Sequence, residues 1–136
     1  MTRPLAICVV CLWVLASGCT GGPATPQDMV FPAGRWTNGS ACLSATDQGC
    51  DLVVGCGHGQ FSKPTVHADG SFSVEGTYRI EAGPVSVNPA PPASFSGTIS
   101  GNALSIIVTP SDPTLQPASY VLSLTSGTAR CTVPCV

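Results

Sequence analysis

Charged and aromatic side chains are scarce in this sequence, and each shortage excludes a class of structure. Charged residues make up 9% of the 136 residues and aromatic residues 6%. So little charge does not suit solvated helices, while the apolar clusters recur too often for a disordered chain. The formal net charge of −2 offers no basic surface to nucleic acid. With few aromatic rings, the interior must consist mainly of Val, Ile, Leu and Phe, and cross-links would help such a thin core.

The first residues lack the length of a membrane span. The apolar run from Leu5 to Ala16 is shorter than the about 20 residues that a spanning helix requires. It follows a basic start at Arg3 and leads to the small residues Ser17 and Gly18. A basic start, a short apolar stretch and small residues are the parts of a secretory signal peptide, which we expect to be residues 1–18.

The residues around Cys19 predict a lipid anchor. Leu15-Ala16-Ser17-Gly18-Cys19 resembles a lipobox, in which the chain is cleaved before the cysteine and the thiol carries diacylglycerol. The usual leucine lies three residues before the cysteine, where this sequence has Ala16. Several acyl chains make such an attachment to the membrane stable. The alternative is an ordinary signal peptide that is cleaved nearby, with an unmodified Cys19.

The rest of the chain divides into a tether and one domain. Gly, Pro and polar residues dominate residues 19–33, which predicts a flexible, lipid-anchored tether. Residues 34–136 are enough for a single β-rich domain. Thr20, rather than an Asp, follows the cysteine. In a two-membrane bacterium we therefore expect the protein in the cell envelope, at the outer membrane.

Short apolar clusters between turn residues predict an all-β domain. The segment Ser71–Glu81 alternates most cleanly, and it places Phe72, Val74, Gly76, Tyr78 and Ile80 on one face. Leu104, Ile106 and Val108 likewise share a face, whereas the glycines of Cys56–Phe61 indicate a tight bend. The expected strands are 41–46, 51–55, 65–68, 71–81, 94–100, 103–109, 119–124 and 129–133. About eight short strands predict an antiparallel meander, folded as a small sandwich or a closed barrel.

The cysteines predict a disulfide-bonded domain. Those that remain after Cys19 are Cys42, Cys50, Cys56, Cys131 and Cys135. Export places them in an oxidising compartment, where disulfides form. We expect Cys56 to bond to Cys131 or Cys135, and Cys42 to Cys50 across a turn, unless strand alternation separates the latter two. One thiol is then left over, whereas an unlipidated Cys19 would allow every cysteine to pair.

No segment carries a complete catalytic or metal-binding motif, so we expect neither enzymatic activity nor a cofactor. Cys56, His58 and His67 form only a weak set of metal ligands, because their spacing matches no standard site. We expect His58 in a turn and His67 on the surface. No G-x-S-x-G sequence is present.

Two further pairs of residues were weighed for a site. Glu75 and Glu81 lie about 20 Å apart along one strand, which is too far for paired acid–base catalysis on one bond. Trp36 and Tyr78 could line a ligand site, but such rings more often belong to a core.

Several short motifs follow one another in order across the domain. They are Trp36, Cys56-Gly57-His58-Gly59, Asp69-Gly70-x-Phe72, Gly76-Thr77-Tyr78, Gly83-Pro84-Val85, Phe95-Ser96-Gly97 and a terminal cysteine. Their order resembles a loosely defined group of small, uncharacterised exported bacterial proteins. The resemblance implies a compact β domain with cysteines at the positions of Cys56 and Cys135, and it implies no activity. Cys42, Cys50 and Cys131 depart from the pattern.

The function expected from the sequence is a non-catalytic binding or structural module of the cell envelope, attached to the membrane by its N-terminal lipid. One alternative is a small envelope hydrolase, which would need a cleft holding His58 or His67 beside a serine and an acid. The other is a metal-binding envelope protein, which would need reduced cysteines.

Overall fold

The computed structural model describes residues 21–81, 89–127 and 130–136, so the signal peptide and Cys19 lie outside the described residues. Within these ranges the chain forms ten β-strands. Their bounds are β1 Met29–Val30, β2 Gly34–Thr37, β3 Ala41–Thr46, β4 Gly49–Val54, β5 Gly57–Phe61, β6 Thr65–Val66, β7 Ser71–Ile80, β8 Pro92–Ser100, β9 Ala103–Pro110 and β10 Ala118–Thr125.

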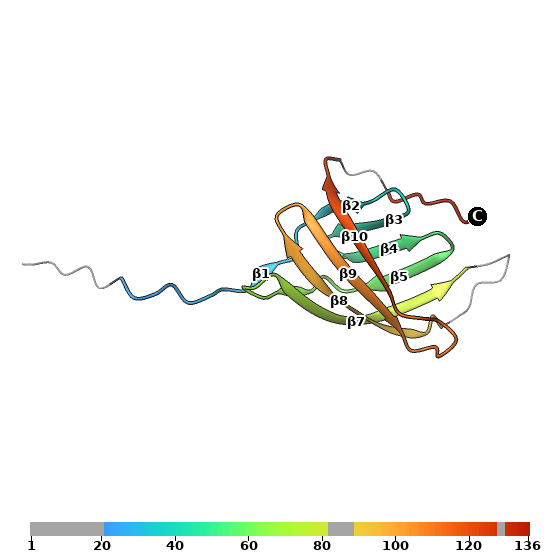
Figure 1. Ribbon diagram of the computed structural model, residues 1–136, viewed down its shortest axis with the longest axis horizontal. Helices are drawn as coiled ribbons and strands as arrows, with labels where there is room; N and C mark the ends of the chain where they lie inside the picture. The colour runs from blue at the N-terminus through green and yellow to red at the C-terminus, as the bar shows by residue number, and fades with distance from the viewer. Residues whose placement is uncertain (1–20, 82–88, 128–129) are drawn as a thin grey trace, which may run out of the picture.

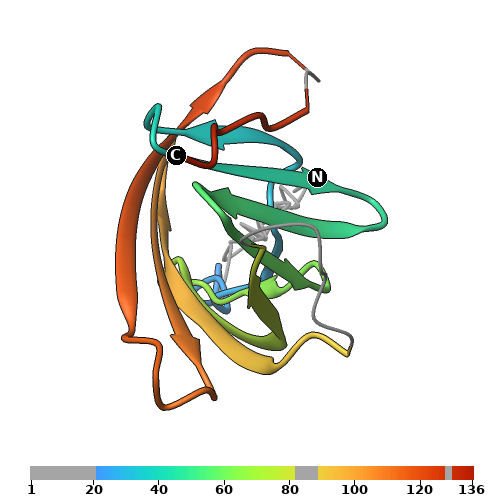
Figure 2. The ribbon, with the colours of Figure 1, turned by 90° about the vertical axis from the view of Figure 1, so that its right-hand side faces the viewer.

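Eight of these strands form one closed, antiparallel barrel (Figures 1 and 2). Each barrel strand pairs with the next one along the chain, and the last strand, β10, pairs with the first, β2. The short strands β1 and β6 form a separate two-stranded sheet. Of the two architectures predicted, the barrel is therefore the one that forms. Closure leaves the barrel with no unpaired strand edge.

The interior of the barrel is filled with side chains. Strand register places Trp36 opposite Leu43 on one side and Leu124 on the other, so that residues of the same row face inward together. An eight-stranded barrel is just wide enough for side chains to fill it. The largest fully buried side chains are Trp36, Phe31, Phe95, Leu43, Leu52, Leu104, Ile106, Leu122 and Val66.

Glycines on the inner face make room for the aromatic rings. A Cβ on Gly59 would lie 2.9 Å from Cε1 of Phe95, and one on Gly76 would collide with the backbone oxygen of Gln60. The space is used by Phe95, whose ring stacks on that of Phe61 at a centroid distance of 4.4 Å. These glycines therefore belong to β5 and β7 and do not interrupt them. The bend predicted over Cys56–Phe61 is wrong for this reason.

One end of the barrel is closed by the N-terminal segment, and we call it the capped end. Phe31 is fully buried there and packs edge-on against Trp36 and Phe72, at centroid distances of 6.2 and 5.3 Å. Val66, from the β1–β6 sheet, is also fully buried. The tether expected over residues 19–33 is therefore shorter, because residues 29–31 already belong to the fold.

The last residues lie outside the barrel wall and are held to it by two disulfides. Cys131 is bonded to Cys42 and Cys135 to Cys56, with Cα–Cα distances of 5.5 and 4.5 Å. We call residues 130–136 the strap. The strand predicted over 129–133 is absent from its described part, residues 130–133. Because β10 already pairs with β2, the barrel has no free edge that another strand could join.

The pairing of cysteines corrects one expectation and decides another. The bond predicted between Cys42 and Cys50 is wrong, since alternation along β3 and β4 turns Cys50 inward and Cys42 outward. Cys50 is instead the free, buried cysteine among the described residues. Of the two partners left open for Cys56, the structure has Cys135, as the resemblance implies. Two disulfides indicate an extracellular or periplasmic domain.

The alternating segment predicted over Ser71–Glu81 is β7. Phe72 and Tyr78 are buried as expected, and Val74 is partly buried. Ile80 is expected in the core, but it is 39% exposed because β7 ends there, still paired with β5, at the rim opposite the cap. The predicted inner face of β9 is confirmed, since Leu104, Ile106 and Val108 are all buried.

Substitution of Gly76 should test the packing of glycines against rings. Gly76→Ala should lower the free energy of unfolding by about 1–3 kcal/mol, because a methyl group there overpacks the interior against backbone that cannot move aside. Urea denaturation measures the change. The matched control is Glu75→Ala, at the neighbouring exposed position. Equal stability of the two variants would contradict this packing.

Removal of the disulfide between Cys56 and Cys135 should test the strap. The bond closes a loop with a sequence separation of 79, so the double substitution by serine should lower the free energy of unfolding by about 2–5 kcal/mol. Denaturation without reductant measures it, and peptide mapping of the unreduced wild type is the control. A linked peptide that joins Cys56 to Cys131, or a free Cys56, would refute the pairing.

Candidate functional site

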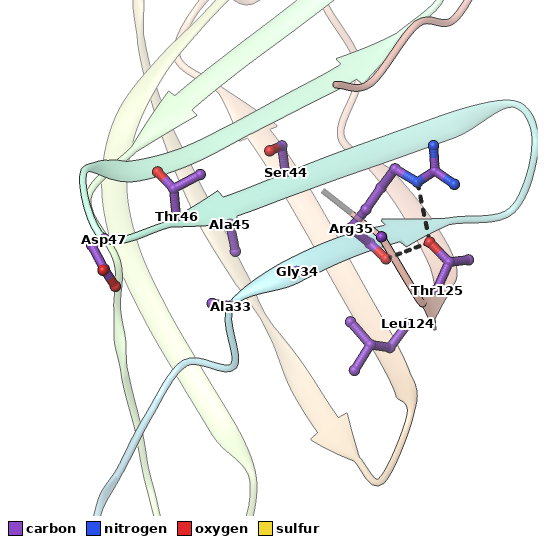
Figure 3. Close-up of a pocket in the computed structure, with 10 residues that line it drawn as sticks. Ala33, Gly34, Arg35, Ser44, Ala45, Thr46, Asp47, Leu124 and Thr125 are labelled. Carbon is purple, nitrogen blue, oxygen red and sulfur yellow. Dashed lines mark hydrogen bonds between the residues drawn. The ribbon is translucent and has the colours of Figure 1, made fainter. Parts of the chain in front are cut away.

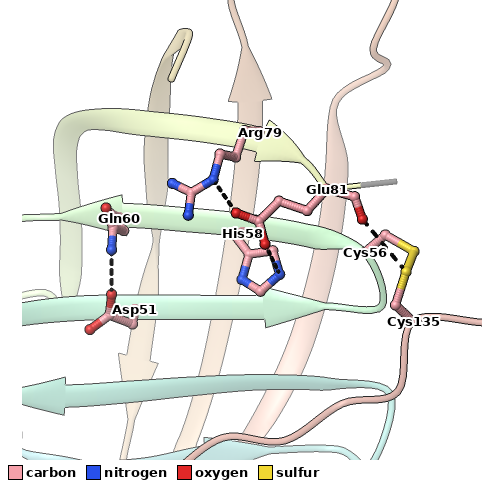
Figure 4. Close-up of polar contacts among 7 residues, drawn as sticks. All are labelled: Asp51, Cys56, His58, Gln60, Arg79, Glu81 and Cys135. Carbon is pink, nitrogen blue, oxygen red and sulfur yellow. Dashed lines mark hydrogen bonds and ion pairs between the residues drawn. A yellow bond between two sulfur atoms is a disulfide. The ribbon is translucent and has the colours of Figure 1, made fainter. Parts of the chain in front are cut away.

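A polar cluster lies on the outside of the barrel, beside the disulfide between Cys56 and Cys135 (Figure 4). The carboxylate of Glu81 accepts a 2.6 Å hydrogen bond from Nε of Arg79 and lies 3.3 Å from Nε2 of His58. Arg79 and His58 are direct cross-strand neighbours on β7 and β5. The backbone N–H of Glu81 donates to the carbonyl of Cys56 at 2.8 Å. Glu81 thereby joins two barrel strands to the turn that carries the disulfide.

The electrostatics of Glu81 favour a structural role for the cluster. The hydrogen bond from Arg79 is the main cause that lowers the pKa of the Glu81 carboxyl, and the charges of His58 and Arg79 act in the same direction. A carboxyl group with a lowered pKa is ionised near neutral pH and does not serve as a proton donor there. The contribution of the ionised Glu81 carboxylate to the stability of the fold is therefore present at neutral pH, and it is lost as the pH falls through the folded-state pKa.

The two histidines lie far apart in the fold, and each contacts a carboxylate. His58 contacts Glu81, from a strand and not from the turn expected. His67 is on the surface at the capped end, with Nδ1 at 3.4 Å from Oδ1 of Asp28. Within the described ranges no hydrogen bond joins either histidine to a serine hydroxyl. The serine, histidine and acid that a hydrolase would need are not brought together there.

The weak set of metal ligands is also separated. Cys56 is half of a disulfide and provides no thiolate, and His58 and His67 lie toward opposite ends of the barrel. In the part of the chain that the structure describes, no three His, Cys, Asp or Glu side chains gather in a way that could hold a metal ion. The set of Cys56, His58 and His67 is therefore wrong as a site.

A groove of about 490 Å³ lies at the capped end, between β2, β3 and the end of β10 (Figure 3). In its wall, Nε of Arg35 donates to Oγ1 of Thr125 at 3.1 Å, and that hydroxyl donates to the carbonyl of Arg35 at 3.0 Å. The two side chains thus fasten β10 to β2, where the barrel closes. The groove is lined by Ala33, Gly34, Arg35, Ser44, Ala45, Thr46, Asp47, Leu124, Thr125 and Gly127.

Trp36, Tyr78 and Cys50 belong to the core. Trp36 is fully buried, and its indole N–H has no hydrogen-bond partner within the described structure. Tyr78 packs with it in the same cluster of buried residues. Burial raises the pKa of the Cys50 thiol to about 11. A thiol that is both buried and protonated at neutral pH is a poor nucleophile.

The role of Glu81 as the centre of the polar cluster is not predicted from the sequence. Glu81 was considered only as a partner of Glu75, along one strand. Its true partners depend on Arg79 lying opposite His58, and this pairing could not be expected while the segment around His58 was assigned to a bend. The signal that was available is the alternation of His58 and Gln60 with small or apolar residues, which fits a strand.

Alkylation should show that Cys50 is the unpaired cysteine of the domain. Iodoacetamide at pH 8 should leave the native protein almost unmodified, because the Cys50 thiol is buried and its pKa is about 11. In denaturant without reductant, Cys50 should react readily, and peptide mass spectrometry should find the adduct there. Rapid labelling of the native protein would contradict this assignment, as would an adduct on Cys42 or Cys131.

Among the described residues, no helix has the length and the apolar character that a membrane crossing requires. No protein-family model, no curated protein and no solved structure matches the chain.

Proposed function

We propose that the protein is a lipid-anchored module of the cell envelope that acts by binding or by structural contact and not by catalysis. The lipobox-like residues before Cys19 support the anchor, and the two disulfides support an exported domain. The likeness in motif order to a loosely defined group of small exported bacterial proteins agrees with this assignment. The absence of Asp after Cys19 favours the outer membrane.

The observation that carries the proposal is the path by which the chain enters the barrel. Residues 21–28 are all exposed and lead directly into β1 (Figure 1). The segment 20–28 can extend at most about 30 Å, at about 3.3–3.6 Å per residue. An anchor at Cys19 would thus hold the capped end of the barrel nearest the membrane, and the opposite end would be presented away from it.

The side chains of the barrel fit a binding or structural role better than a catalytic one. His58 and His67 each contact a carboxylate, and Glu81 is held ionised by Arg79. The interior is occupied by fully buried rings and aliphatic side chains. Contacts of this kind give a rigid body whose outer surface and open end are available to a partner.

Metabolic labelling should test the anchor. Cells that express the wild type and are fed a palmitate analogue should yield labelled protein, and Cys19→Ser should abolish the label because the thioether cannot form. The control is Cys50→Ser, which removes a buried thiol and should keep the label. Label retained by Cys19→Ser would refute lipidation at this residue. Density-gradient separation of the membranes then reports whether the labelled protein is in the outer membrane.

A further inference from the structure

At the end opposite the cap, apolar side chains of the described barrel strands are partly exposed. Ile80 lies directly opposite Gly57 and faces the same side of β7 as Phe72 and Tyr78. Phe72, near the capped end, is 3% exposed, whereas Ile80 is 39% exposed. An inward-facing aliphatic side chain thus remains accessible to solvent at this end. We call this end the mouth.

Two adjoining hollows, of about 160 and 180 Å³, occupy the mouth. They share Tyr78, Ile80 and Leu115 and therefore form one cup. Most of the wall is apolar, from Val108, Pro110, Ala118 and Pro91, and Tyr120 stands beside Tyr78. A protein cavity of about 150 Å³ lined by apolar side chains accommodates a molecule the size of benzene. Each of the two hollows accordingly has room for a single ring.

The walls of the cup are held in place by hydrogen bonds. Leu115 comes from the loop between β9 and β10, and its N–H donates to the carbonyl of Asp112 at 3.1 Å. The Asp112 carboxylate in turn accepts bonds from the N–H and the hydroxyl of Thr114, at 2.9 and 2.7 Å. On the opposite wall, the N–H of Tyr78 donates to the carbonyl of Pro91 at 2.9 Å. A cup formed before the ligand arrives loses less conformational freedom on binding.

The charges near the cup are already engaged. Arg79 bonds to Glu81, and Asp112 bonds to Thr114. Neither charge is left to select an ion, which favours a neutral ligand. Burial raises the pKa of both phenols, Tyr78 and Tyr120, so they remain neutral O–H donors at physiological pH. Among the hydrogen bonds between described residues, neither phenol has a partner. The hydroxyl of Tyr78 lies against Gly57, which lines neither hollow, so the Tyr120 hydroxyl is the donor available to an oxygen of a ligand.

We propose that the cup at the mouth binds a small, neutral ring compound that carries one oxygen acceptor, such as a phenol or a cyclic ketone. This inference rests on the proposed binding role and deepens it, because it names the site and the class of ligand. The site faces away from the membrane in the proposed orientation. The apolar walls supply contact area, and the Tyr120 hydroxyl, from the wall on β10, fixes the orientation in which the ligand is held.

Methyl NMR of the full, lipidated protein in lipid nanodiscs tests the proposal, with p-cresol as the probe. The methyl signals of Ile80, Val108 and Leu115 should shift together along one saturable curve, while those of Leu43 and Leu52, deep in the barrel, should not move. D-glucose, a neutral ring of similar size with a polar surface, should produce no saturable shift. Shifts that never saturate, or an equal response to glucose, would overturn the proposal.

Two variants locate the binding. Ala118→Phe places a ring in the cup and should weaken p-cresol binding about tenfold or more, which is about 1.4 kcal/mol or more. Its matched control is Ser119→Phe, the next residue on the outer face of β10, which should bind as the wild type does.

Leu115→Ala removes part of the cup wall without altering a barrel strand. If Ala118→Phe fails to fold, as loss of the methyl signals of the core would show, Leu115→Ala tests the site in its place. Unchanged binding in Leu115→Ala and in any folded Ala118→Phe protein would overturn the site. Lipidation at Cys19 is measured separately, by the palmitate-analogue experiment. A lipidated protein that fails to bind p-cresol would therefore refute the ligand site in the cup and leave the proposed lipid anchor in place.

Discussion

The pairing of β10 with β2 is the contact on which the rest of the structure depends. It joins the first and last strands of the barrel, which lie 90 residues apart where Arg35 meets Thr125. Because the barrel is closed there, it has no strand edge of its own, and the strap lies along its outside. The two disulfides of the strap follow from that path. A contact between residues so distant in sequence forms only after a large loss of chain entropy.

Packing inside the barrel depends on glycines whose missing side chains leave space for aromatic rings from other strands. Gly59 and Gly76 have no side chain where the ring of Phe95 lies, and Phe31 fills the end that the strands leave open. No such filling is seen at the mouth among the described residues, where Ile80 faces inward and is 39% exposed. The two ends of one barrel therefore differ in character. At the capped end the ring of Phe31 is fully buried, whereas at the mouth the inward-facing Ile80 is partly exposed.

Local patterns predicted six of the eight barrel strands, but they missed β2 and β5 and predicted a strand over 129–133 that is absent from residues 130–133. Long-range contacts could not be predicted from local patterns. Alternation identified β7 and β9, because burial of every second residue, as at Leu104 and Ile106, is visible within the sequence of one strand. A sandwich and a barrel share such strands, and only the pairing of β10 with β2 separates them. The glycines that flank His58 suggest a bend because the rings for which they leave space, Tyr78 beside Gly57 and Phe95 beside Gly59, lie on other strands. Leu115, in the wall of the mouth, comes from a loop with no periodic signal at all.

The disulfides also impose an order on the chain as it leaves the cytoplasm. The partners of Cys42 and Cys56 both lie within the last residues, with sequence separations of 89 and 79. An exported chain emerges from its N-terminal side, so Cys42, Cys50 and Cys56 arrive in the oxidising compartment long before Cys131 and Cys135. During this interval neither Cys131 nor Cys135 is available as a partner for them. Once the barrel has formed, Cys50 is buried and its thiol cannot attack a disulfide. The folded domain therefore retains the bonds of Cys42 to Cys131 and of Cys56 to Cys135.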